Sequence, residues 1–285
     1  MRILFTIPHF YGPKPKRESK CRHGAHEDAG DRVKALSACL AALHQIYGEA
    51  QCVMQLARKQ TGPTNQKTKA RVRVVICTTG NQHLLAQLPV GQDLFEHYPS
   101  DANPERLGFL CQETLAERLG DFDYYCYLED DLILHDPWLF TKLVWFNGHV
   151  GQDKLLLPNR FERGVGPLAH KAYVDGDLAR RVTARFQDVD DCPWLESEVL
   201  GTKVVFRRPL NPHSGCCFLN AEQMQHWSAK RHFRDRDTSF IGPLESAATL
   251  GIMRTFKIYK AAMENASFLE IEHYGARFLS LIRKP

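Results

Sequence analysis

The chain has 285 residues, of which 44% are apolar and 25% charged, and its formal net charge is +4. This length allows one large domain or two small ones with a substantial core, and we expect a single domain. A charge this small gives no sign of a nucleic-acid-binding surface, and no nucleic-acid partner is expected.

The cysteines and the N-terminal segment indicate the cellular compartment. The nine cysteines are odd in number and include no C-x-x-C pair, and several lie in apolar segments where a free thiol packs as a small hydrophobe. The first ten residues, MRILFTIPHF, lack the long apolar region of a signal peptide. No uncharged apolar stretch of roughly 20 residues occurs. We therefore expect a cytoplasmic protein with no transmembrane segment, and peripheral membrane contact remains open.

Strand and helix patterns alternate from the N-terminus. Residues 2–8 (RILFTIP) predict a strand. Residues 12–32 are rich in glycine, proline and charge and predict a loop, which is either a lid over a ligand or a solvated insertion. Residues 33–47 have apolar side chains at helical spacing and stop at Gly48, which predicts a helix.

The same alternation continues after a polar spacer at residues 60–70. Residues 71–79 predict a β-branched strand, 104–119 a helix that begins with proline and glutamate, and 124–128 a buried strand. Strands separated by such helices predict an α/β fold with a mostly parallel central sheet and helices on both faces. Ligands of such sheets bind at the carboxyl ends of the strands.

Three adjacent carboxylates stand at that end of the strand 124–128. Glu129, Asp130 and Asp131 lie between this strand and the apolar residues 132–134. Their mutual repulsion would be offset by a divalent cation, and Mg²⁺ and Mn²⁺ prefer oxygen ligands and commonly bridge carboxylates to phosphates. The alternative is a solvated turn at the end of the strand.

The segment ERLGFLCQETLAERLGDFDYYCYLEDDLILHDPWL resembles the central segment of GT-A-fold glycosyltransferases, in which a strand ends in a D-x-D-type metal motif. The start, ILFTIPHFYG, is similar to their first strand and nucleotide-binding loop. The resemblance covers the first 150 residues in order. It implies a Rossmann-like GT-A domain over 1–285, with a nucleotide-sugar-binding half (1–150) and an acceptor-binding half (151–285).

The resemblance assigns roles to residues of the first half. Glu129 and Asp131 match the outer carboxylates of the motif and would be metal ligands, although the motif here is Glu-Asp-Asp. Asp130 would be a ligand or contact the ribose. Pro8 and His9 match the nucleotide-binding loop.

The second half offers further matches. Gly215 fits the family's glycine-containing loop near the donor sugar; the rival interpretation is a plain β-turn. Glu245 follows Gly-Pro at the start of a helix and would be the general base. The family usually pairs two acids there, but Ser246 follows Glu245 in this chain. The rival interpretation is a carboxylate in the first turn that the helix dipole stabilises.

A histidine near the C-terminus supplies a further metal ligand in many GT-A members. His273 matches this position, and the alternative is a packed or surface histidine. His9 and His213 are weaker candidates for the same role.

The resemblance implies a metal-dependent, hexosyltransferase-like enzyme that uses Mn²⁺ or Mg²⁺. It would move a sugar from a nucleoside-diphosphate sugar to a carbohydrate or other hydroxyl acceptor, with inversion. Two alternatives remain: a sugar-phosphate nucleotidyltransferase and a non-catalytic binding protein on the same scaffold.

If residues 12–32 are a lid over the donor phosphates, its basic residues would be Lys14, Lys16, Arg17, Lys20 and Arg22.

Overall fold

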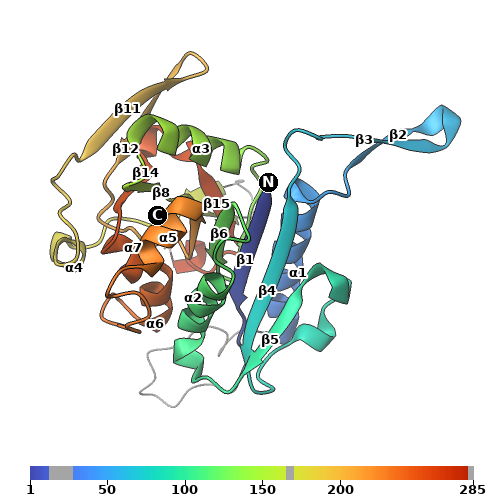
Figure 1. Cartoon of the computed structure of the whole chain (residues 1–285), viewed down its shortest axis with the longest axis horizontal. Helices are drawn as coiled ribbons and strands as arrows, with labels where there is room; N and C mark the ends of the chain where they lie inside the picture. The colour runs from blue at the N-terminus through green and yellow to red at the C-terminus, as the bar shows by residue number, and fades with distance from the viewer. Residues whose placement is uncertain (13–27, 165–169, 282–285) are drawn as a thin grey trace.

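The computed structural model describes residues 1–12, 28–164 and 170–281. Its central sheet has five strands in the order β13-β6-β1-β4-β5 (Figure 1). Four of them are parallel and β13 is antiparallel to β6. The strands are β1 (Arg2–Pro8), β4 (Arg71–Thr79), β5 (Glu96–Ser100), β6 (Tyr124–Leu128) and β13 (Cys216–Asn220).

Helices cover both faces of this sheet because alternate side chains of β1 point to opposite sides. Ile3, Phe5 and Ile7 belong to the core beneath α1 (Ala29–Tyr47) and α3 (Leu139–Val150). Leu4 belongs to the core on the other face, with side chains of α2 (Leu107–Glu117), α5 (Ala221–Ser228) and α7 (Gly251–Met253). The predicted α/β architecture with a mostly parallel central sheet is therefore present.

Two further four-stranded sheets, in the orders β10-β9-β15-β7 and β11-β12-β14-β8, lie beside the central one. They mix parallel and antiparallel pairs, which the sequence did not predict. Their strands are β7 (Leu132–Ile133), β8 (Lys154–Leu156), β9 (Asn159–Gly164), β10 (His170–Tyr173), β11 (Trp194–Val199), β12 (Thr202–Arg207), β14 (Lys257–Ala261) and β15 (Glu270–His273).

The remaining helices are short. An α-helical turn, α6 (Pro243–Glu245), leads through a π-helical turn at Ser246–Leu250 into α7. The π turn packs on α2, where Gln112 Nε2 donates a hydrogen bond of 2.7 Å to the carbonyl of Ala247. The others are α4 (Arg180–Ala184) and the 3-10 turns Leu56–Arg58, Leu85–Gln87, Gln92–Leu94, Pro104–Arg106, Met263–Phe268 and Leu279–Leu281.

The predicted boundaries change at two helices. The helix expected at 33–47 begins at Ala29, where the Asp28 side chain accepts hydrogen bonds from Gly30 N and Asp31 N, so residues 29–32 are not loop. Residues 13–27 of the proposed lid, which include Lys14, Lys16, Arg17, Lys20 and Arg22, lie outside the described residues. The helix expected at 104–119 is a 3-10 turn followed by α2.

A β-hairpin, which the sequence did not predict, lies between α1 and β4 and includes the first part of the polar spacer. Strands β2 (Cys52–Gln55) and β3 (Gln60–Pro63) pair antiparallel and project from the body of the molecule (Figure 1). Their side chains are almost all exposed, so they have no alternation of apolar and polar residues from which a strand could be predicted. Among the residues that the structure describes, no helix is long and apolar enough to cross a membrane.

Candidate active site

The acidic trio is buried at the carboxyl end of β6. Glu129, Asp130 and Asp131 are 4%, 0% and 8% exposed. The backbone turns directly after the strand, because Glu129 N donates to Gly215 O at 2.9 Å and Leu132 N donates to Glu129 O at 3.2 Å. The interpretation as a solvated turn is therefore wrong, and the carboxylates face the interior.

Strand pairing brings His273 to Asp131. β15 lies antiparallel to β7 with His273 opposite Leu132, and Tyr274 N donates to Asp131 O at 2.8 Å. As a result, His273 Nε2 lies 3.6 Å from Asp131 Oδ2. The two residues are 142 positions apart in the sequence, and both were predicted as ligands of one metal ion.

Glu162 on β9 orients the imidazole of His273. Glu162 Oε1 lies 2.9 Å from His273 Nδ1, and the carboxylate also accepts from Phe278 N at 3.1 Å and Leu279 N at 2.7 Å. Burial by itself raises the pKa of Glu162, but these hydrogen bonds lower it by a larger amount. The pKa of Glu162 therefore lies below its ordinary value. An ionised carboxylate only accepts, so Nδ1 carries the proton and Nε2 faces Asp131.

The charge of Asp130 is held by two buried partners. His9 Nδ1 lies 2.6 Å from Asp130 Oδ2, and Arg32 Nη2 from α1 contacts both carboxylate oxygens. The backbone N–H of Leu84 donates to His9 Nε2 at 3.1 Å, so Nδ1 is the nitrogen that donates to Asp130. His9 and Asp130, both predicted to contact the donor, thus lie in a buried contact with each other.

Glu129 faces a different set of groups. Its oxygens lie 3.8 Å from His213 Nε2 and 3.9 Å from Arg160 Nη1. Gly215 has φ +65°, and a Cβ at this position would lie 2.6 Å from Glu129 Oε2. Both the turn conformation and the close approach require glycine here, and the group that approaches is the Glu129 carboxylate.

Arg160 belongs to a buried ion cluster with Asp175 and Lys260. Asp175 Oδ1 accepts from Arg160 Nη2 at 2.7 Å, and Lys260 Nζ lies 3.2 Å from Asp175 Oδ2. Burial raises the pKa of Asp175, but Lys260 and Arg160 lower it far below the usual range. Burial, and then Arg160, lower the pKa of His213 well below its ordinary value, so His213 is neutral at pH 7.

The arrangement of Asp131 and His273 fits a cation that is bound by only a few protein side chains. Within residues 1–12, 28–164 and 170–281, no three His, Cys, Asp or Glu side chains form a preformed metal cage, so Glu129 does not close one with Asp131 and His273. Mg²⁺ and Mn²⁺ sites need no such cage, since these ions keep waters and take oxygens from substrate phosphates. At metal sites, a histidine that binds the metal through one ring nitrogen usually donates a hydrogen bond from the other ring N–H to a carboxylate. Asp131 and His273 therefore suit such an ion.

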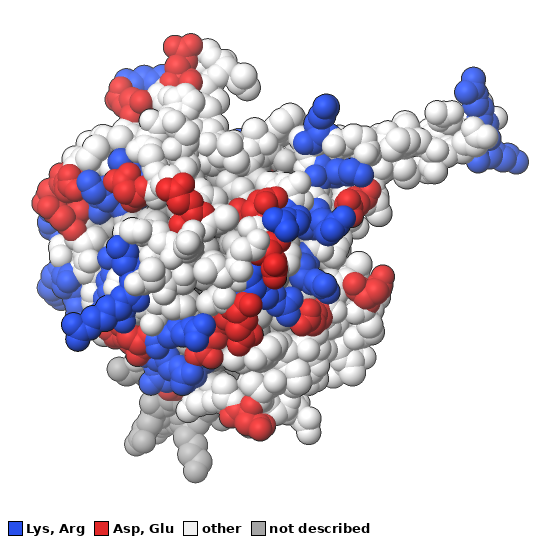
Figure 2. Space-filling view, viewed as in Figure 1, with Lys and Arg blue, Asp and Glu red and all other residues white. Residues whose placement is uncertain are grey.

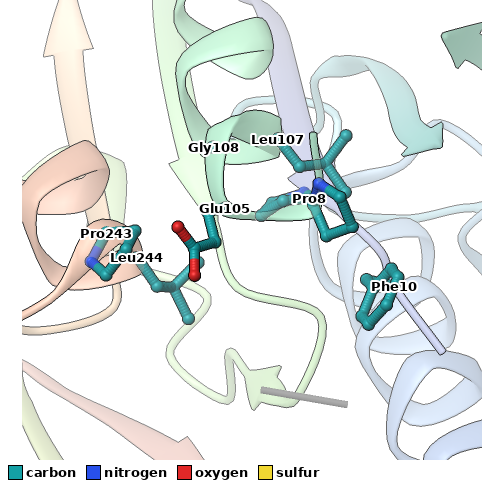
Figure 3. Close-up of a pocket in the computed structure, with 8 residues that line it drawn as sticks. Pro8, Phe10, Glu105, Leu107, Gly108, Pro243 and Leu244 are labelled. Carbon is teal, nitrogen blue, oxygen red and sulfur yellow. The ribbon is translucent and has the colours of Figure 1, made fainter. Parts of the chain in front are cut away.

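Glu245 lies half-buried in the first turn of α6, and the two residues before it, Pro243 and Leu244, line a narrow pocket. Figure 3 shows that this pocket is bordered by Leu244 from α6, by Pro8 at the end of β1 and Phe10 just after it, and by Glu105 in the 3-10 turn before α2. The other lining residues are Leu107, Gly108, Pro104 and Pro243. Pro8 thus lines the pocket, while His9 turns to Asp130.

The π turn that follows Glu245 contacts the acidic trio through His213. Thr249, in the π turn after α6, lies 3.1 Å from His213 Nδ1 through its Oγ1, and His213 Nε2 faces Glu129. π turns of this kind often occur at functional sites. The pocket and the carboxylate cluster are therefore neighbouring parts of one region at the carboxyl end of the sheet.

Sequence reasoning missed several charged residues of this region. Arg160 and Glu162 alternate along β9 (NRFERG), and this i, i+2 pair of opposite charges beside an apolar strand was the available signal. Arg32 was assigned to the loop. Asp175 and Lys260 have no local pattern, because their contacts form only through strand pairing.

Comparison with known proteins adds little. No protein-family model and no curated protein matches the chain. A structure of mouse xyloside xylosyltransferase 1 in its apo form aligns at 11% identity, covering 100% of this chain and 99% of that chain, with a TM-score of 0.39. A mannose-1-phosphate geranyltransferase from Thermus thermophilus aligns at 10% identity, covering 91% of this chain and 73% of that chain, with a TM-score of 0.36. Both similarities are remote.

Proposed function

We propose that this chain is a metal-dependent glycosyltransferase that moves a sugar from a nucleoside-diphosphate sugar to a hydroxyl acceptor, such as a carbohydrate. The observation that carries the proposal is the buried row Glu162–His273–Asp131 at the carboxyl edge of a mostly parallel sheet. It directs an imidazole nitrogen and a carboxylate oxygen to one point, where ligands of such sheets bind.

Asp131 and His273 would hold Mn²⁺ or Mg²⁺, and Glu129 remains a predicted third ligand. When bound, the ion would neutralise negative charge on a departing diphosphate. Arg32 and Arg160 add fixed positive charge beside the same carboxylates, since Arg32 Nη1 lies 3.4 Å from Asp131 Oδ2. Preorganised charges of this kind stabilise a leaving anion without rearrangement.

Glu245 would be the general base. It would take the proton of the acceptor hydroxyl while that oxygen forms a bond to the anomeric carbon and the bond from that carbon to the diphosphate oxygen breaks. Attack from the face opposite the diphosphate predicts inversion. Support comes from the position of Glu245 directly after the pocket residues Pro243 and Leu244. Further support comes from the contact between the following helical segment and Glu129, which runs through Thr249 and His213.

The proposal is tested by measuring thermal unfolding with a panel of nucleoside diphosphates, with and without Mn²⁺. A ligand at 100 times its dissociation constant stabilises the folded state by about 2.7 kcal/mol. We expect stabilisation by one nucleotide only when Mn²⁺ is present. A flat response to the whole panel would contradict the proposal.

A second measurement separates the two enzyme classes. With the corresponding nucleotide sugar and an alcohol acceptor, a glycosyltransferase releases nucleoside diphosphate, whereas a nucleotidyltransferase releases pyrophosphate from a nucleoside triphosphate. A non-catalytic binding protein would bind the nucleotide and release neither.

A further inference from the structure

The projecting hairpin has a composition unlike that of the rest of the chain. The hairpin arm, residues 50–69, carries four basic side chains and no acidic one. Its charge of +4 equals the net charge of the whole protein, so the remaining residues sum to zero. Figure 2 shows the blue side chains at the end of the arm. The basic residues are Arg58, Lys59, Lys67 and Lys69.

Apolar side chains stand beside these cations at the end of the arm. Leu56 is 79% exposed and Met54 69% exposed, and they stand two and four residues before Arg58, the first of the basic pair Arg58 and Lys59. None of the four basic residues forms an ion pair within the part of the chain that the structure describes. Two-stranded hairpins are at best marginally stable alone in water, so an arm with this surface is suited to contact a partner.

We propose that the hairpin arm binds the surface of an anionic lipid bilayer. Leu56 and Met54 would enter the headgroup boundary while Arg58 and Lys59 contact lipid phosphates, the combination that distinguishes interfacial membrane anchors. A single-stranded nucleic acid would require aromatic side chains for base stacking, and the arm, residues 50–69, contains none.

The position of the arm makes this contact independent of the proposed active site. The arm joins the end of α1 to the start of β4, and Ala70 N at its base donates to Tyr47 O at 2.6 Å. It therefore leaves the amino end of the parallel sheet, and the acidic trio lies at the carboxyl end (Figure 1). Membrane binding would hold the protein at a surface without occupying its pocket.

The test is co-sedimentation of the full chain with phosphatidylcholine vesicles containing 0% or about 30% phosphatidylserine. We expect binding only to the anionic vesicles, and weaker binding as salt is raised. The variant R58Q/K59Q should bind about thirty-fold less tightly, which corresponds to about 1 kcal/mol for each cation near the surface. The variant L56S should bind about tenfold less tightly.

Matched controls use exposed residues away from the arm. R181Q/R231Q removes two exposed cations, and L200S removes an exposed leucine from the turn between β11 and β12. Both should bind vesicles as the parent protein does. Absence of binding to anionic vesicles, or equal losses in the arm and control variants, would overturn the proposal. So would an arm-dependent dimer in solution that sediments with neither vesicle type, or binding to single-stranded RNA in place of vesicles. Nucleotide-induced stabilisation is measured separately and is expected to be unchanged in every arm variant.

Discussion

Glu162 and His273 form a buried hydrogen bond, 2.9 Å from Oε1 to Nδ1, that leaves the other imidazole nitrogen 3.6 Å from Asp131 Oδ2. If this bond orients a metal ligand, the variant E162Q should bind Mn²⁺ 10- to 100-fold more weakly, as loss of such supporting carboxylates usually does. The measurement is Mn²⁺ titration followed by calorimetry or by the electron paramagnetic resonance of free Mn²⁺.

The matched control is E272Q. Glu272, on β15, is a buried carboxylate like Glu162. It accepts hydrogen bonds from Arg163 Nε at 2.9 Å and Arg163 Nη2 at 2.6 Å, and it has no hydrogen bond to the imidazole of His273. Both variants should lose stability, and only E162Q should lose Mn²⁺ affinity. Equal Mn²⁺ affinity in the two variants would reduce Glu162 to a structural role.

Asp131 is expected to link nucleotide binding to the metal. In the variant D131N, the stabilisation by nucleoside diphosphate with Mn²⁺ should disappear, because the amide is neutral and a poor ligand for a hard cation. The control is D101N, since Asp101 is exposed and also follows a strand of the central sheet at its carboxyl end. Thermal unfolding of both variants with the nucleotide checks this. Retained Mn²⁺-dependent stabilisation in D131N would exclude Asp131 as a ligand.

A substitution at Gly215 tests whether the Glu129 carboxylate leaves room for a side chain at residue 215. The variant G215A should be destabilised by about 1–2 kcal/mol from the positive φ, and by more because its Cβ would lie 2.6 Å from Glu129 Oε2. Gly201 provides the control, since it has φ +75° and no atom within 4 Å of an added Cβ. G201A should therefore show the backbone cost alone. Chemical denaturation measures both, and equal losses would mean that the contact with Glu129 does not restrict residue 215.

Much of the fold was predictable because the core strands are apolar and continuous. β1, β4 and β6 lie where the apolar runs 2–8, 71–79 and 124–128 predict them. Gly48, directly after α1, was also predicted as the end of that helix. The hairpin arm was not predictable, because its strands bury nothing and so carry no periodic signal.

The candidate site was predictable only in part, for a related physical reason. The acidic trio stands out locally, because three adjacent carboxylates between apolar segments require compensation. His273 was proposed from a family resemblance, and its distance from Asp131 depends on the pairing of β15 with β7. The charged residues around the trio, Arg32 on α1 and Arg160 and Glu162 on β9, come from elements distant in the sequence. A charged residue on a single strand or helix is ordinarily predicted to face solvent, so these contacts were not predicted.

The buried ion cluster predicts a specific dependence of stability on pH. Because the pKa of Asp175 in the folded protein is depressed, its charge stabilises the folded state above the ordinary carboxyl pKa near 4, and this contribution is lost as the pH falls below that value. The variant D175N should be destabilised by about 3–5 kcal/mol at pH 7, since Arg160 and Lys260 stay buried without their carboxylate. Chemical denaturation of both proteins at pH 7, 4 and 3 should show this difference narrowing toward low pH. If the difference in the free energy of unfolding between the two proteins stays constant down to pH 3, the loss of stability in D175N does not come from the charge of Asp175.

Glu245 is the residue on which the proposed chemistry depends most directly. The variant E245Q should lower kcat by about 10²- to 10⁴-fold, the usual contribution of a general base, while nucleotide-induced stabilisation stays unchanged. The control is E222Q, because Glu222 is an exposed acid in the first turn of α5 and has the same favourable position in a helix dipole. If Glu245 acts only as a first-turn carboxylate, both variants should lose a few tenths of a kcal/mol of stability and keep full activity. Steady-state kinetics of the two variants, with unfolding midpoints measured on the same preparations, distinguishes a catalytic carboxylate from a capping one.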